Sequence, residues 1–233
     1  MLALFLGACG WQMWSIHKYN AAVREAEEAG FFWQSAGTFS LIRKDWHNAL
    51  KKETWGVSHR YLDMGEVPDL GRYREVLYRI RPTILIVRGC ENVDILKGLT
   101  SLERLWLDRC PSVQNVDELK DFTVLQWLSL SGSPALKDVS DGLKGLTGLQ
   151  SLNFYGCPVL ENLDGLKHLH TLQKLNLREC PALKNIDALK GLTGLQQLDL
   201  RGCKIPAAAL RELRAALPNT DITFPDGTKN PPQ

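Results

Sequence analysis

Residues 172–181 read LQKLNLRECP, and this pattern decides the fold of the chain. Close variants of the pattern L-x-x-L-x-L-x-x-C-P begin at Leu102, Leu125, Leu149 and Leu195. Ser133 replaces the cysteine in one copy, Phe154 replaces a leucine in another, and a shorter first copy runs from Leu85 to Cys90. Successive cysteine or serine positions are 20, 23, 24, 23 and 23 residues apart, so one structural unit is repeated six times.

The spacing of the leucines predicts the structure of each unit. Alternating leucines in L-x-L point to one side of a β-strand, while the residues between them point to the other side. A unit of about 23 residues cannot enclose its own leucines, so neighbouring units must stack to bury them. The pattern therefore predicts an α/β solenoid with parallel strands on a concave face and short helical or irregular return segments.

The repeats resemble those of bacterial leucine-rich repeat proteins over residues 84–224. This resemblance implies the solenoid fold and says almost nothing about the ligand. Residues 21–30, AAVREAEEAG, follow an apolar stretch, as in planctomycete-type membrane-anchored leucine-rich repeat proteins. That second resemblance implies an N-terminal membrane segment.

The first sixteen residues, MLALFLGACGWQMWSI, carry no charge. We predict that residues 1–16 form part of a transmembrane helix and associate the protein with a membrane, although a full span needs about 20 residues. Two alternatives are a lipobox ending at Cys9 and a buried helix packed on the first repeat. In the second alternative the protein is cytoplasmic.

The remaining chain divides into three parts. Residues 17–82 are expected to form an α+β N-terminal cap, with helices over residues 15–29 and 68–80 and a hairpin over residues 31–42. Residues 83–224 are the repeats and a C-terminal cap, in which Leu210, Leu213 and Leu217 share one face of a helix and residues 222–224 form a strand. We predict a disordered tail over residues 225–233.

Five of the six cysteines occupy one position of the repeat: Cys90, Cys110, Cys157, Cys180 and Cys203. In a repeat of this kind that position is a buried turn, so we expect a ladder of reduced thiols. Disulfides and a metal site are the alternatives. The C-x-x-C spacing that favours zinc is absent from the sequence.

The remaining polar residues give no sign of chemistry. The net charge of +2 gives no reason to expect nucleic acid or an acidic partner. The five histidines are scattered, and the sequence has no phosphate-binding, nucleophile-elbow or zinc-protease motif. We therefore expect neither an enzyme nor a cofactor.

An aspartate recurs three residues before a lysine in five units. We expect these aspartates to cap the return segments, and the lysines to form a solvated face rather than an anionic docking strip. The five aspartates are Asp94, Asp117, Asp141, Asp164 and Asp187.

The outward strand positions vary between repeats. The first column of these positions is Ile84, Arg104, Trp127, Ser151, Lys174 and Gln197. The second is Ile86, Trp106, Ser129, Asn153, Asn176 and Asp199, and the third is Arg88, Asp108, Ser131, Tyr155, Arg178 and Arg201. Aromatic and arginine side chains on an exposed sheet are typical anchors of protein partners. The predicted partner-binding residues are Trp106, Trp127, Tyr155, Arg178 and Arg201.

A competing explanation for part of this face is that the N-terminal cap covers Ile84, Ile86 and Trp106. The sequence as a whole predicts a monomeric, non-catalytic protein–protein interaction module, tethered to a membrane by its N-terminus, that binds a partner on the concave face. Two alternatives are a soluble intracellular scaffold and the recognition subunit of an enzyme complex.

Overall fold

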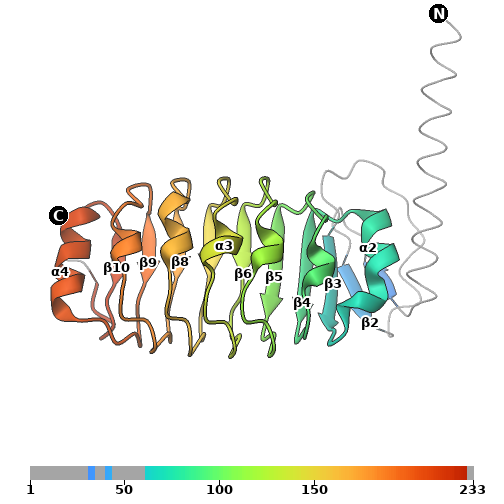
Figure 1. Ribbon diagram of the computed structural model, residues 1–233, viewed down its shortest axis with the longest axis horizontal. Coiled ribbons are helices and arrows are strands. Elements are labelled where there is room, and N and C mark those ends of the chain that lie inside the picture. Colours follow the sequence, from blue (N-terminus) through green and yellow to red (C-terminus); the bar gives the residue numbers. More distant parts are fainter. Residues whose placement is uncertain (1–30, 35–39, 44–60, 230–233) are drawn as a thin grey trace, which may run out of the picture.

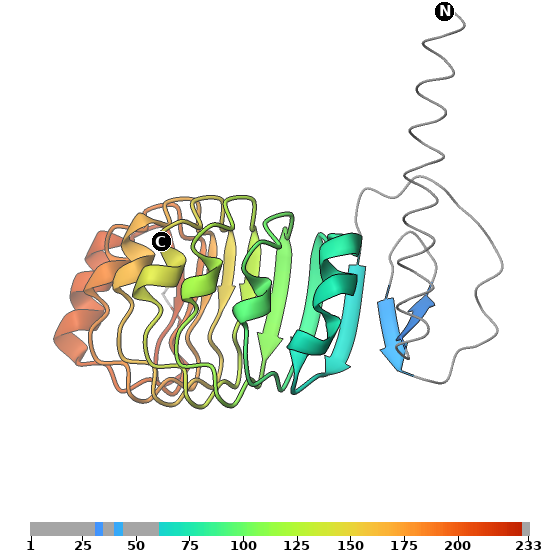
Figure 2. The same cartoon turned by 45° about the vertical axis from the view of Figure 1, so that its right-hand side comes forward.

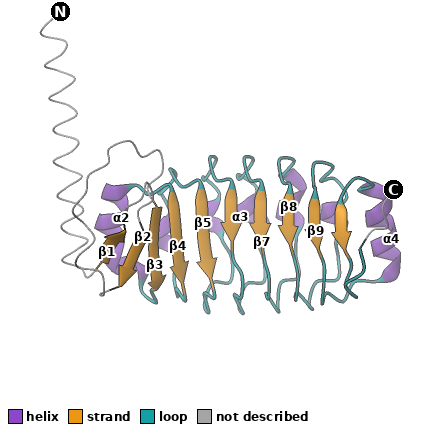
Figure 3. Ribbon diagram, turned by 180° about the vertical axis from the view of Figure 1, so that it is seen from behind, coloured by secondary structure: helices purple, strands orange, loops and turns teal. Residues whose placement is uncertain are grey.

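The structure is a computed structural model that describes residues 31–34, 40–43 and 61–229 (Figure 1). Eight parallel strands form one open sheet in which each strand pairs with the next along the chain. The strands are β3 (Tyr61–Glu66), β4 (Ile84–Arg88), β5 (Arg104–Asp108), β6 (Trp127–Ser129), β7 (Ser151–Asn153), β8 (Lys174–Asn176), β9 (Gln197–Asp199) and β10 (Asp221–Thr223). Figure 3 shows this sheet face-on.

Short helical turns run on the opposite side of the solenoid and connect the strands (Figure 2). They are η2 (Asp94–Leu96), η3 (Asp117–Leu119), α3 (Ser140–Leu143), η4 (Asp164–His168) and η5 (Asp187–Leu189). Four are 3-10 turns, and α3 is an α-helical turn in the repeat with the longest step, 24 residues. The predicted solenoid of parallel strands with short return segments is confirmed.

The repeated leucines fill the space between the sheet and the return segments. In one repeat, Leu102, Leu105 and Leu107 are all fully buried, and the equivalent side chains of the other repeats join them in one continuous core. Each such side chain contributes about 1.5–3 kcal/mol relative to exposure. Because every coil covers the apolar side of the next, stability depends on stacking.

The parallel sheet begins earlier than the sequence predicted. β3 lies inside the predicted cap of residues 17–82, and it pairs with β4 with Leu62 beside Leu85. Leu62 and Met64 are buried as in an L-x-L strand, so residues 61–66 act as an additional degenerate repeat. The repeat pattern does not identify this strand, because Val67 stands where the other units have a cysteine or serine.

Other parts of the predicted cap agree with the structure. β1 (Phe31–Gln34) and β2 (Ser40–Arg43) pair in antiparallel fashion, which confirms the expected hairpin. η1 (Leu70–Tyr73) followed by α2 (Arg74–Ile80) corresponds to the predicted helix over residues 68–80. The helix predicted over residues 15–29 lies outside the described residues.

The C-terminal cap agrees with the sequence up to its tail. α4 (Ala207–Ala216) follows Pro206, with Leu213 and Leu217 buried and Leu210 packed against the core. The prediction of a disordered tail does not hold for residues 225–229, because this segment turns back and Lys229 pairs with Thr223 of β10. Residues 230–233 lie outside the described part.

The prediction of a transmembrane helix requires correction. In residues 31–34, 40–43 and 61–229, no helix is long and apolar enough to cross a bilayer. The apolar segment of residues 1–16, including the proposed lipobox at Cys9, lies outside the described residues.

The predicted capping role of the repeated aspartates is also wrong. The side chain that accepts a backbone N–H at the start of each return segment belongs to an Asn or Asp located before it, as in Asn162, which accepts from the N–H of Asp164 at 2.8 Å. The equivalent acceptors in the other units are Asn92, Asn115, Asp138 and Asn185. Three of the repeated aspartates instead pair with the lysine three residues later, at 2.6–2.7 Å, namely Asp141, Asp164 and Asp187.

The cysteine position contains one disulfide and one ladder of thiols. Cys90 and Cys110 form a disulfide that joins the coils of β4 and β5, so the expectation of reduced thiols is wrong for this pair. The other three are free and buried, as expected, and we call Cys157, Cys180 and Cys203 the thiol ladder. Each of these thiols donates to a backbone carbonyl of the preceding coil, at 3.0–3.2 Å.

Candidate partner-binding face

The parallel register places the variable strand residues in straight columns. Trp127 of β6 pairs in register with Arg104 of β5 on one side and with Ser151 of β7 on the other. Because neighbouring strands are about 4.8 Å apart, side chains of one column are close enough to touch. We call the three columns of outward side chains, on β4 to β9 and two residues beyond the short strands, the concave face.

Two predicted anchors on the concave face form an aromatic pair. The rings of Trp106 and Trp127 stack with their centroids 5.8 Å apart and their planes at 28°. Trp127 is 36% exposed and Trp106 is partly buried. The indole of Trp106 stacks against Trp127 from the β5 side, and part of the Trp127 side chain remains in solvent.

Two further anchors form a second group. The guanidinium of Arg178 lies over the ring of Tyr155, 5.6 Å from its centroid, and Tyr155 is 43% exposed. A cation over an aromatic face is attracted by the negative potential of the ring. This contact holds Arg178 at the surface next to an aromatic side chain.

Arg201, the fifth predicted residue, is engaged with its own strand. Its Nε donates to both carboxylate oxygens of Asp199 at 3.0 Å. Partial burial raises the pKa of Asp199, but hydrogen bonds from the side chain and backbone of Arg201 outweigh it, so the pKa lies below its ordinary value. Arg201 is therefore a partly neutralised cation at the β9 end of the face.

The competing explanation for the apolar end of the face is that the N-terminal cap covers it, and the burial of Ile84 supports this explanation for one isoleucine. Ile84 is buried and Ile86 is partly buried, and they pair in register with Tyr61 and Asp63 of β3. The additional strand of the solenoid therefore flanks both side chains. Trp106 lies one strand further and remains partly exposed.

Two exposed cations of the face without an ion-pair partner in the described chain were not among the predicted site residues. Arg104 and Lys174 are exposed, and neither has an ion-pair partner within the described chain. By contrast, Arg88 is paired with Asp63 at 3.2 Å. The signal in the sequence was their position in the same column as Trp127.

The carboxylate of Asp108, on the same strand as Trp106, already accepts hydrogen bonds. Asp108 accepts from the hydroxyl of Ser129 at 2.6 Å and from the backbone N–H of Ser131 at 3.2 Å. Asn153 in turn donates to the Ser129 hydroxyl at 3.2 Å. This network fixes the floor of the concave face and leaves the rings as its projecting groups.

Exposed apolar side chains are rare in the solenoid. Among the described residues, the large hydrophobic side chains that are exposed are Val124, Trp127, Tyr155 and Val159. Single exposed valines in turns are ordinary, whereas exposed aromatic rings are the side-chain type that most often anchors a protein partner. Trp127 and Tyr155 are therefore predicted anchors that the structure leaves exposed.

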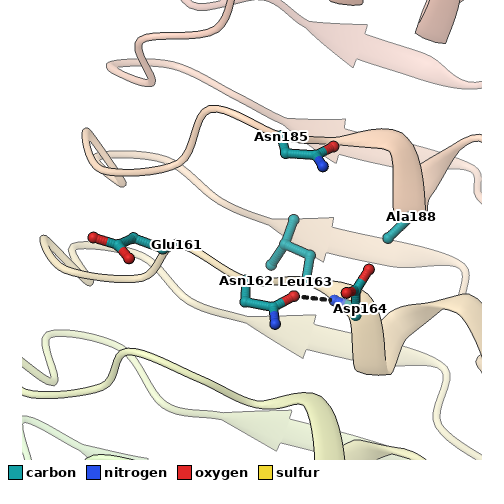
Figure 4. A pocket seen from close by; sticks show the side chains of 6 residues that line it. All are labelled: Glu161, Asn162, Leu163, Asp164, Asn185 and Ala188. Carbon is teal, nitrogen blue, oxygen red and sulfur yellow. Dashed lines mark hydrogen bonds between the residues drawn. The ribbon is translucent and has the colours of Figure 1, made fainter.

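Apart from the concave face, a small depression lies between two return segments (Figure 4). Glu161, Asn162 and Asp164 line it with Leu163, Asn185 and Ala188, and its volume is about 230 Å³. The Asn162 side chain is already used to accept the N–H of Asp164. Because these polar groups stabilise the turn, the depression offers no separate chemistry.

The described residues also lack a metal centre. No group of three or more His, Cys, Asp or Glu side chains in this part of the chain is arranged to hold a metal ion. Burial raises the pKa of Cys157 and Cys203 to about 11 and that of Cys180 to about 12. These thiols are protonated at neutral pH and are poor nucleophiles or metal ligands.

No family model matches the chain, and no curated protein matches it by sequence. Solved structures are similar. Internalin C2 from Listeria monocytogenes has a TM-score of 0.53 and 24% identity, with 72% of this chain and 69% of that chain covered. The leucine-rich repeat domain of the type III effector XopL has a TM-score of 0.52 and 22% identity, with 73% and 70% covered. The fold is a leucine-rich repeat solenoid.

Another similar structure is larger than this chain. Internalin F from Listeria monocytogenes has a TM-score of 0.52 and 21% identity over 64% of this chain, but the match spans only 42% of internalin F. These identities show the leucine-rich repeat fold alone. They confirm the resemblance to bacterial leucine-rich repeat proteins at the level of fold, and the planctomycete-type resemblance stays a prediction.

Proposed function

We propose that this leucine-rich repeat solenoid is a non-catalytic protein-interaction module that binds a protein partner on its concave face. Trp106, Trp127 and Tyr155 would be the anchors, with Arg178 and Arg201 beside them. The observation that carries the proposal is that two of the few exposed large apolar side chains are aromatic and lie on this face.

The physical reason is that this surface offers a large apolar contact area while losing little side-chain entropy on binding. A partly buried Trp pair and a Tyr under a guanidinium present large apolar area at small cost in side-chain entropy. The scaffold beneath them is rigid, because each strand is hydrogen-bonded to both neighbours. Rigid anchors lose little freedom when a partner binds.

The test is capture of a partner from native lysate by the full chain. Replacing Trp127 and Tyr155 by alanine should weaken capture by about 30-fold or more, which corresponds to the loss of at least 2 kcal/mol of binding energy. The matched control replaces Val124 and Val159, which are similarly exposed but lie in turns outside the three outward columns, by alanine.

Circular dichroism of both double variants should match the parent chain, because none of the four side chains belongs to the core. Unchanged capture by the aromatic double variant, or equal loss in the valine control, would refute the concave face as the binding site.

A further inference from the structure

The first column of the concave face places two unpaired cations around an aromatic ring. Its order across β5 to β8 is Arg104, Trp127, Ser151 and Lys174, with one residue of the column on each strand. Arg104 and Lys174 are three strand spacings apart, or about 14 Å at 4.8 Å per strand. Both are exposed and have no ion-pair partner among the described residues.

Between the two cations, the two neighbours of Trp127 differ in size. Trp106 stacks against Trp127 from the β5 strand, so that side of the ring is covered. Toward β7, the neighbour of Trp127 in the same column is Ser151, whose short side chain is buried, so the indole is the exposed group of this pair. An apolar side chain of a partner can therefore pack on the exposed part of Trp127.

These distances match one kind of ligand. In an extended peptide, residues i, i+2 and i+4 point to the same side, and residues i and i+4 are about 13 Å apart at 3.3 Å per residue. Carboxylates at i and i+4 would reach Arg104 and Lys174, and the side chain at i+2 would lie between Trp127 and Ser151. We propose that the concave face binds an extended acidic protein segment with the pattern acidic-x-apolar-x-acidic, running along the solenoid axis across the strands.

The remaining charges of the face favour a segment with spaced carboxylates over nucleic acid. Asp108 lies on β5, and Asp199 on β9, at the borders of the same surface. A strand with a phosphate at every nucleotide would bring some of its charges close to these carboxylates. An extended segment with carboxylates only at positions i and i+4 keeps its negative charges away from both Asp108 and Asp199. This inference rests on the proposed function, because it assigns the chemistry of the partner to the same face.

The test uses the full chain and a fluorescein-labelled peptide, Ser-Glu-Ser-Phe-Ser-Glu-Ser, followed by fluorescence anisotropy. Binding should weaken with added salt, as expected for exposed ion pairs. Arg104→Gln and Lys174→Gln should each weaken binding by about two- to fivefold, because an exposed pair contributes about 0.2–1 kcal/mol. A peptide with the two Glu residues moved next to Phe should bind more weakly than the original.

A charge swap separates recognition from loss of folding. The variant Arg104→Glu/Lys174→Glu should lose the acidic peptide and gain the peptide Ser-Lys-Ser-Phe-Ser-Lys-Ser. The matched control is Lys97→Glu/Lys120→Glu, which makes the same change in net charge on the return segments and should bind the acidic peptide like the parent. A ten-residue oligothymidylate serves as the nucleic-acid probe.

Four results would overturn the inference: no binding of the acidic peptide at millimolar concentration, equal binding of the Lys peptide by the parent chain, no effect of the charge swap, or tighter binding of the oligothymidylate. Loss of binding in Trp127→Ala without any charge dependence would leave the concave face as the site while removing the acidic segment. Failure of the aromatic double variant to affect partner capture would instead remove the proposed function itself.

Discussion

Gly145 and Gly191 occupy the same position of two repeats, after Lys144 and Lys190, but only one of them has room for a side chain. A β-carbon added at Gly145 would lie 2.8 Å from the carbonyl carbon of Lys120 and closer still to its oxygen. At Gly191 nothing lies within 4 Å of the added atom. Neither glycine has a positive φ, so backbone strain does not distinguish them.

The structure gives a magnitude for each substitution. In Gly145→Ala the carbonyl group of Lys120 must retreat by more than about 1 Å, because its oxygen lies closer to the added β-carbon than its carbon does. Overpacking of this kind costs about 1–3 kcal/mol. Gly191→Ala should instead stabilise the chain by about 0.4–1 kcal/mol, because alanine restricts the unfolded chain and meets no obstacle.

The assay is thermal and urea unfolding of the full chain followed by circular dichroism. We expect Gly145→Ala to melt below the parent and Gly191→Ala slightly above it, with a separation on the order of 3–15 °C. Equal stability of the two variants would show that the close approach of Gly145 to Lys120 of the preceding coil does not exist. A loss confined to Gly191→Ala would refute the reasoning altogether.

Three further predictions concern the cysteine position. The buried hydroxyl of Ser133 has no hydrogen-bond partner among the described residues, whereas the thiols of the ladder reach the preceding coil. Ser133→Cys should therefore raise the free energy of unfolding by about 1 kcal/mol, and a change no larger than that of Ser133→Ala would contradict this account. The Cys90–Cys110 disulfide spans 20 residues, and its reduction should lower the free energy of unfolding by about 3 kcal/mol. Mass spectrometry that finds both thiols free in the untreated, unfolded chain would contradict the disulfide. The thiol ladder should resist alkylation at pH 8 in the native chain and react once it unfolds. Because burial raises the pKa of these thiols above the ordinary value of 9.0, their contribution to stability is complete below pH 9 and is lost as the pH rises to about 11–12. Stability that is constant over this pH range would contradict their burial.

Much of the solenoid could be predicted because its cause is local and repeated. Leucines spaced as in residues 172–181 can leave water only if coils stack, so the strand positions and the parallel sheet follow from the pattern. The same pattern fails where a unit departs from it. The strand at residues 61–66 keeps the alternation of Leu62 and Met64 but lacks the cysteine, so the repeat pattern does not identify it.

Side-chain partners could not be read from the repeat. The aspartates at the start of the return segments looked like caps, but the side chain of Asn162 and its equivalents reaches the free N–H first. The cysteine ladder looked uniform, but Ser133 separates the Cys90–Cys110 disulfide from the three thiols. These outcomes depend on distances between adjacent coils, which the sequence spacing does not specify.

The concave face shows the same division between sequence and structure. The sequence alone determined which residues point outward, because alternation in a strand is set by backbone geometry. Only the tertiary structure decided which of their charges are neutralised. Arg201 is held by Asp199 and Arg88 by Asp63, while Arg104 and Lys174 on either side of Trp127 lack a partner in the described chain. The net charge of +2 does not reveal this arrangement, because ion pairing depends on which charged side chains the fold brings close together.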